Sequence, residues 1–171
     1  MRSDITSRRK AGGEMDAIEF LADDNLQTRR FFRAIKKMTE PDQLADKMML
    51  LKQVCDDLMI HMRIEELIFY PALRAQLHND ALVEEALVQH DVIRALLQDL
   101  QSAPAAHPTF DATLEALSES IDLHATAKEN VLFPTALDCS LDTEALGRML
   151  AAASYQLRLE CRRTAETINI D

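Results

Sequence analysis

Three of the five histidines, His61, His90 and His124, fall on the apolar stripes of three different predicted helices. His61 is followed four residues later by Glu65, and His124 is followed five residues later by Glu129. A spacing of four residues places two side chains on the same face of a helix. A carboxylate on an apolar face needs a positive partner, because burying an unpaired charge is costly. Imidazole and carboxylate together suit iron, manganese or zinc, so the pattern predicts a buried metal site.

The helices that carry these residues form a two-fold repeat. Capping residues, apolar spacing and prolines predict helices over residues 14–37, 42–70, 80–102, 109–133 and 142–164. Asn25 and His90 occupy equivalent positions in the first and third helices. His61 and His124 do so in the second and fourth, and a proline lies ten residues after each of them. A repeated helical hairpin predicts an all-α fold, an up-down-up-down four-helix bundle with polar residues meeting in its interior.

The bundle is expected to span residues 14–138, between two segments of different character. Residues 1–13 carry four basic residues and one acidic residue, and we expect them to form a mobile basic tail. Residues 139–171 are predicted to hold an additional C-terminal helix with an apolar stripe of its own. That stripe must be covered, so we expect the helix to pack on the bundle or to form a homodimer interface.

Composition and charge exclude several classes of protein. The 171 residues carry a formal net charge of -10, which argues against nucleic-acid binding. No stretch approaches the ~20 apolar residues of a membrane span and no secretory signal is present, so we expect a cytoplasmic protein that does not bind membranes. The three cysteines form no CxxC pair, and the three glycines are too few for a phosphate-binding loop. An HExxH zinc motif is absent as well. Nucleotide and hydrolase chemistry are therefore not expected.

The spacing also separates two kinds of di-iron bundle. A site of the ferritin type requires Glu-x-x-His, but the residues three before the stripe histidines are Leu58, Leu87 and Ile121. The pattern instead resembles the hemerythrin-like family, the HHE cation-binding domain, over residues 16–138. The resemblance rests on two segments, His61-x-x-x-Glu65-Glu66 before Phe69-Tyr70-Pro71 and His124 with Glu129 before Leu132-Phe133-Pro134.

This resemblance implies a non-heme di-iron centre inside the bundle. Carried over by position, the ligands would be His61 on one iron, His90 and His124 on the other, and Glu65 and Glu129 as bridges. A centre of this kind implies dioxygen or nitric oxide as a small ligand, or a role in sensing oxygen, nitric oxide or iron. The interior offers no further acid, base or nucleophile, so we expect binding or sensing rather than enzymatic turnover.

Two positions depart from the family pattern. The usual first-helix histidine is replaced by Asn25, whose amide is a weaker candidate ligand than imidazole. Lys128 stands four residues after His124, where Glu65 stands four residues after His61. We therefore expect two iron ions, or a single ion if the half that contains Asn25 is incomplete, and another divalent metal also suits this ligand set.

A metal-free bundle is the alternative. If the Lys128 side chain points inward, its ammonium pairs with Glu65 and takes the place of the metal as the positive partner. The chain would then be a helical module for regulation or protein interaction, with a decayed metal site closed by a salt bridge.

Overall fold

The structure is a computed structural model that describes residues 15–77, 80–102, 105 and 108–168. The predicted basic tail over residues 1–13 lies outside the described residues. Across the described part, the secondary structure consists of helices and the turns that join them.

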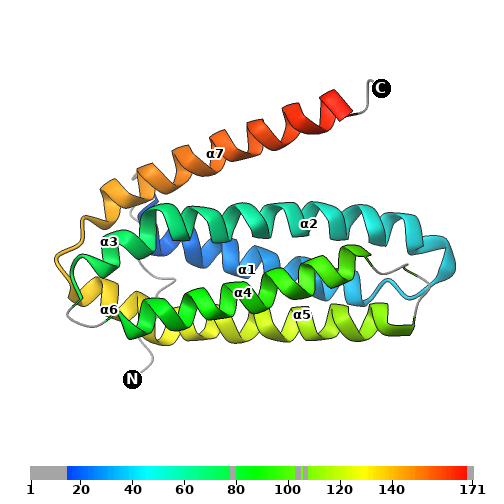
Figure 1. Cartoon of the computed structure of the whole chain (residues 1–171), viewed down its shortest axis with the longest axis horizontal. Coiled ribbons are helices and arrows are strands. Elements are labelled where there is room, and N and C mark those ends of the chain that lie inside the picture. Colours follow the sequence, from blue (N-terminus) through cyan, green and yellow to red (C-terminus); the bar gives the residue numbers. More distant parts are fainter. Residues whose placement is uncertain (1–14, 78–79, 103–104, 106–107, 169–171) are drawn as a thin grey trace.

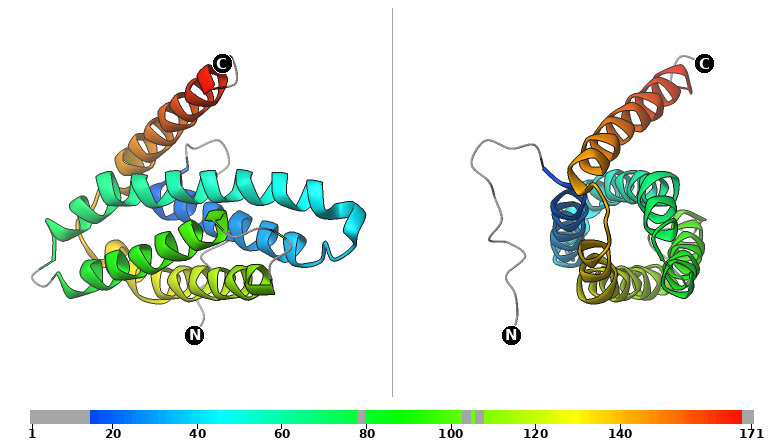
Figure 2. Two further views of the ribbon diagram at one scale, coloured as in Figure 1. Left: turned by 45° about the vertical axis from the view of Figure 1, so that its right-hand side comes forward. Right: turned by 90° about the vertical axis from the view of Figure 1, so that its left-hand side faces the viewer.

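Four long helical stretches run up and down and form a bundle (Figure 1). Viewed along the bundle in the right-hand panel of Figure 2, the four stretches stand at the corners of a square. The stretches are α1 (Ala17–Lys36); α2 (Leu44–Ile64), which continues through the π-helical turn η3 (Glu65–Phe69) into α3 (Tyr70–Arg74); α4 (Ala81–Ser102); and α5 (Pro108–Ala127), which continues through a second π-helical turn η4 (Lys128–Leu132) into α6 (Phe133–Asp138). A 3-10 turn η2 (Pro41–Gln43) precedes α2. The predicted all-α bundle is confirmed.

The predicted ends of the second and fourth helices are wrong. We expected helices to stop at Tyr70 and Phe133, because a proline follows each residue and disfavours helical geometry there. The chain instead stays helical through Pro71 and Pro134. A π-helical turn ends two residues before each proline, so the backbone hydrogen bonds are already shifted where the proline lacks its N–H.

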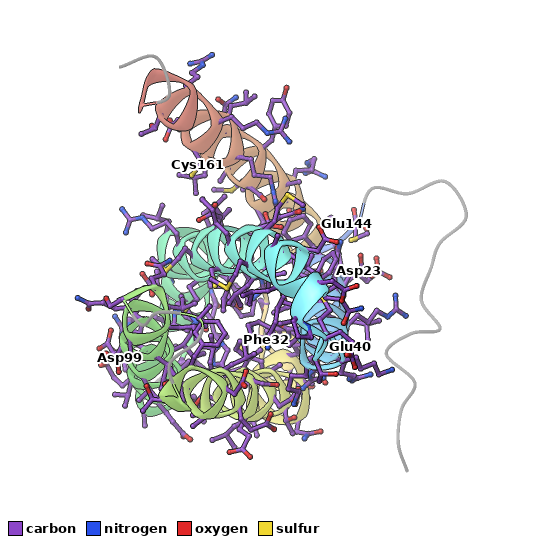
Figure 3. All side chains as sticks on the ribbon, turned by 90° about the vertical axis from the view of Figure 1, so that its right-hand side faces the viewer. Asp23, Phe32, Glu40, Asp99, Glu144 and Cys161 are labelled. Atoms are coloured by element: carbon purple, nitrogen blue, oxygen red, sulfur yellow. The ribbon has the colours of Figure 1, made fainter. Side chains whose placement is uncertain are left out.

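The interior consists of two apolar layers with a polar layer between them. One apolar cluster includes Leu21 and Phe69, and the other includes Phe32 and Leu58. Figure 3 shows Phe32 inside the bundle, whereas Asp23, Glu40 and Asp99 lie on its outside. The buried residues of α4 recur every three or four positions, which is the spacing of a single helix face, and those of α1 also gather on one face. Polar residues occupy this face only at the middle level, at Asn25 of α1 and His90 of α4.

A further helix, α7 (Thr143–Ile168), lies outside the square. Its first half packs on the bundle, where Leu146 and Leu150 are buried together with residues of α1. Its second half leaves the bundle obliquely, as Figures 1 and 2 show. A homodimer through this helix stays a prediction. Among the described helices, none is both long and apolar enough to cross a membrane.

The close packing of α7 on α1 depends on Gly147. A Cβ atom at this position would meet the backbone of Met15, Asp16 and Ala17, with Ala17 N at 2.9 Å. We expect Gly147→Ala to lower the free energy of unfolding by about 1–3 kcal/mol, the usual effect of overpacking. This loss of stability is larger than the gain of about 0.5–1 kcal/mol that alanine gives over glycine in the middle of a helix. Urea unfolding measures the change.

An alanine on the exposed side of the same helix is the control for Gly147→Ala. Ala152 is exposed, so Ala152→Ser should change the free energy of unfolding by no more than about 0.5 kcal/mol. If Gly147→Ala were as stable as the starting protein, the packing of α7 on α1 would be looser than described.

Candidate metal site

Six polar residues from the four bundle helices are buried in the middle layer. They are Asn25, His61, Glu65, His90, His124 and Lys128, each with at most 5% of its surface exposed. The structure therefore brings together four of the five predicted metal ligands, as well as the weaker candidate Asn25. Glu129, the fifth, lies outside this layer and pairs with Arg29 of α1.

Two of the imidazoles are held by their outer nitrogen atoms. His90 Nδ1 lies 2.8 Å from Glu66 Oε1, and Arg94 also contacts that oxygen. His124 Nδ1 lies 2.8 Å from Gln89 Oε1. Carboxylate and amide oxygens only accept hydrogen bonds, so each Nδ1 carries the ring hydrogen and, in a neutral ring, each Nε2 carries a lone pair. Outer partners of this kind fix the tautomer and orientation of metal-binding histidines.

The free lone pairs converge on one point. The Nε2 atoms of His90 and His124 are 3.2 Å apart. Glu65 Oε2 lies 3.2 Å from the His90 nitrogen and 3.7 Å from the His124 nitrogen. One ligand atom from each of the three residues falls within 4.8 Å of the others. Acceptor atoms this close repel one another unless a cation or a donor lies between them.

Tyr70 supplies one hydrogen to this group of acceptors. Its hydroxyl oxygen lies 3.4 Å from Glu65 Oε2 and 3.3 Å from His90 Nε2. Burial, reinforced by the charge of Glu65, raises the pKa of Tyr70 far above its usual value, so the phenol stays protonated. A single O–H cannot satisfy three acceptors, which leaves room for a cation among Glu65, His90 and His124.

The third imidazole has a different partner. His61 Nδ1 lies 3.2 Å from Asp24 Oδ2, so its Nε2 also carries a lone pair in the neutral ring. That lone pair accepts a hydrogen bond from Lys128 Nζ at 2.9 Å. Lys128 Nζ also donates to Glu65 Oε1 at 2.6 Å. Both Lys128 and Glu65 are completely buried, so the structure realises the salt bridge that the metal-free alternative requires.

Burial and pairing set the charges of the layer. Burial alone would raise the pKa of Glu65, but the Lys128 ammonium and the surrounding imidazoles hold it well below its usual value. Burial lowers the pKa of His124 to about 3, and the charge of Lys128 adds to this effect. His124 is therefore neutral at physiological pH, which is the form that binds metals. Burial also lowers the pKa of Lys128, against the opposing effect of Glu65.

Sequence reasoning missed the outer partners of the histidines. Asp24, Gln89 and Glu66 each hold one Nδ1, but none was predicted to do so. A signal was present, because Asp24 and Gln89 directly precede Asn25 and His90 in the repeat. The role of Tyr70 could not be read from the sequence, because it depends on how the π-helical turn η3 orients the residues on either side of it.

A surface pocket of about 300 Å³ reaches the outer side of His61. It lies between α1, α2 and α7, and its lining includes Asp24, Asp57 and Arg158. Arg158 of α7 contacts Asp57 of α2 at this place. Through this pocket the His61 side of the polar layer comes close to solvent.

Comparison with known proteins agrees with the predicted family. The family model of the hemerythrin HHE cation binding domain matches residues 16–136. A crystal structure of a hemerythrin HHE cation binding domain-containing protein, the Rv2633c homolog from Mycobacterium kansasii, is similar with a TM-score of 0.77. The two sequences are 23% identical, and the alignment covers 89% of this chain and 93% of the other, so this likeness shows the fold alone. A search of curated proteins found no match.

Proposed function

Because the chain belongs to the hemerythrin HHE cation-binding domain family, we propose that it binds non-heme iron through Glu65, His90 and His124. The observation that carries the proposal is the convergence of two imidazole lone pairs and a carboxylate oxygen on one buried point. Two histidines and one carboxylate with open coordination positions are a ligand set typical of ferrous iron in oxygen chemistry. The proposed role is the binding or sensing of dioxygen or nitric oxide.

Iron bound there would supply redox cycling and open positions for a diatomic ligand. Other residues of the chain orient the ligand atoms of this site. Glu66 and Gln89 hold the two imidazoles with their lone pairs inward. Tyr70 keeps a proton beside Glu65 Oε2. The apolar clusters on either side exclude water, which strengthens the attraction between the acceptor atoms and a cation.

Reconstitution with iron tests the proposal. The metal-free protein is incubated anaerobically with ferrous ions and desalted, and the retained iron is counted by elemental analysis. We expect iron to be retained by the starting protein and lost from a variant that carries both His90→Gln and His124→Gln. A folded starting protein that retains no more iron than this variant would contradict the proposal.

The outer partner of His124 offers a finer prediction. Gln89→Leu removes the oxygen that accepts the His124 Nδ1 hydrogen, so the ring loses its fixed tautomer and orientation. We expect the affinity for ferrous ions to fall by about 10- to 100-fold. Anaerobic titration in competition with a chelator measures this change. Gln98→Leu, at an exposed position of the same helix, should leave the affinity unchanged. Equal effects of the two substitutions would contradict the role of Gln89 in orienting His124.

The metal-free interaction module is the second candidate, and the Lys128–Glu65 contact at 2.6 Å favours it. This candidate explains what neutralises the buried charge of Glu65 and what donates to the lone pair of His61, because Lys128 does both. It does not account for the lone pairs of His90 and His124, which face each other at 3.2 Å. The reconstitution experiment separates the two candidates, because the module retains no iron.

A further inference from the structure

The two-fold repeat relates every residue of the proposed iron site to a second residue in the same layer. Residues 25 and 90 are equivalent, as are 61 and 124, and 65 and 128. The repeat therefore relates the set His90, His124 and Glu65 to the set Asn25, His61 and Lys128. We call these two sets the metal half and the lysine half.

The outer contacts show that the repeat holds in space. Asp24 holds His61 in the lysine half, and its equivalent Gln89 holds His124 in the metal half. The ion pairs behind them correspond in the same way. They are Arg94 with Glu66, and Arg29 with Glu129 at 3.1 Å.

The inner positions break this symmetry twice. Lys128 replaces a carboxylate. Its Nζ lies 2.9 Å from His61 Nε2, whereas in the metal half the equivalent residue Glu65 places Oε2 3.7 Å from His124 Nε2. Asn25 replaces an imidazole, and although it is 95% buried, its Nδ2 finds no hydrogen-bond partner among the described residues. Of the three positions, only His61 keeps an imidazole, and its Nε2 lone pair accepts a hydrogen bond from Lys128 Nζ.

We propose that the ammonium group of Lys128 takes the place of a second cation, so that the chain binds one metal ion beside a fixed positive charge of its own. This inference rests on the proposed function. The two oxygens of Glu65 have different partners. Oε1 accepts from Lys128 at 2.6 Å. Oε2 lies 3.2 Å from His90 Nε2, 3.4 Å from His61 Nε2 and 3.7 Å from His124 Nε2.

The same geometry explains why a second metal ion is excluded. A metal bound to His61 Nε2 and Glu65 Oε1 would need the place that Lys128 Nζ fills. The lysine half thus keeps its shape without a metal.

Restoring the symmetry tests the inference. A variant with Asn25→His and Lys128→Glu gives the lysine half the same side chains as the metal half. Both proteins are loaded anaerobically with ferrous ions, and native mass spectrometry counts the ions on each folded chain. We expect one ion on the starting protein and two on the variant.

The other outcomes are distinct. Two ions on the starting protein, or one ion on a folded variant, would overturn the inference and leave the proposed function standing. No ion on the starting protein would overturn both. A second comparison serves if the double variant does not fold: His124→Gln should abolish binding, whereas His61→Gln should weaken it far less. Equal loss in these two variants would make His61 a metal ligand and overturn the inference.

Discussion

Replacing Lys128 with methionine should lower the free energy of unfolding by about 3–5 kcal/mol in buffer that contains a metal chelator. The substitution leaves the completely buried Glu65 carboxylate without its ammonium partner at 2.6 Å and deprives His61 Nε2 of a donor. A buried charge that loses its partner keeps its full desolvation cost. Urea unfolding followed by circular dichroism measures the loss. Adding Glu65→Gln removes the unpaired charge, so the double variant should recover much of the stability.

An exposed ion pair of the same length provides the control. Lys52 and Asp56 are also 2.6 Å apart, but the Lys52 side chain is 75% exposed. Lys52→Met should therefore lower the free energy of unfolding by no more than about 0.5 kcal/mol. If Lys128→Met and Lys52→Met had the same small effect, Lys128 would not be buried against Glu65 as described.

Ferrous ions should stabilise the folded chain. A metal that binds only the folded state adds about 2.7 kcal/mol to the free energy of unfolding at a free concentration of 100 times its dissociation constant. His124→Gln removes one of the three converging ligand atoms, and we expect it to abolish this gain. Anaerobic urea unfolding with and without ferrous ions measures both effects.

His107, which lies outside the described residues, allows the same chemical change elsewhere in the chain. His107→Gln should keep the full stabilisation by ferrous ions. If the His124→Gln variant were stabilised as much as the His107→Gln variant, the metal would bind at another place, and the candidate site would lose its support.

The bundle could be predicted from the sequence because its pattern is strong and repeated. The expected stripe of α4, with His90 among apolar residues, is the buried face that the structure has. The helix ends at Pro71 and Pro134 could not be predicted from local preference alone. A proline usually ends a helix, but a preceding π-helical turn lets the chain continue, and tertiary packing decides between the two.

The candidate site could be predicted in part. His61, Glu65, His90 and His124 lie together because helical spacing places them at one level of the bundle. Glu129 was expected there because its carboxylate suits a metal, but five residues after His124 is a poorer match to the inner face than four. The structure follows the spacing: Lys128 is inside and Glu129 is outside. In the first half, likewise, Glu65 is inside and Glu66 lies behind His90.

The central claim is that a metal ion binds among Glu65, His90 and His124 while Lys128 fills the equivalent place in the other half. A crystal of the iron-loaded protein, with anomalous diffraction recorded at the iron absorption edge, tests it most directly. We expect one anomalous peak per chain, in contact with His90 Nε2, His124 Nε2 and the Glu65 carboxylate, and Lys128 still paired with Glu65. A peak beside His61 with Lys128 displaced, or no peak in the middle layer, would contradict the account.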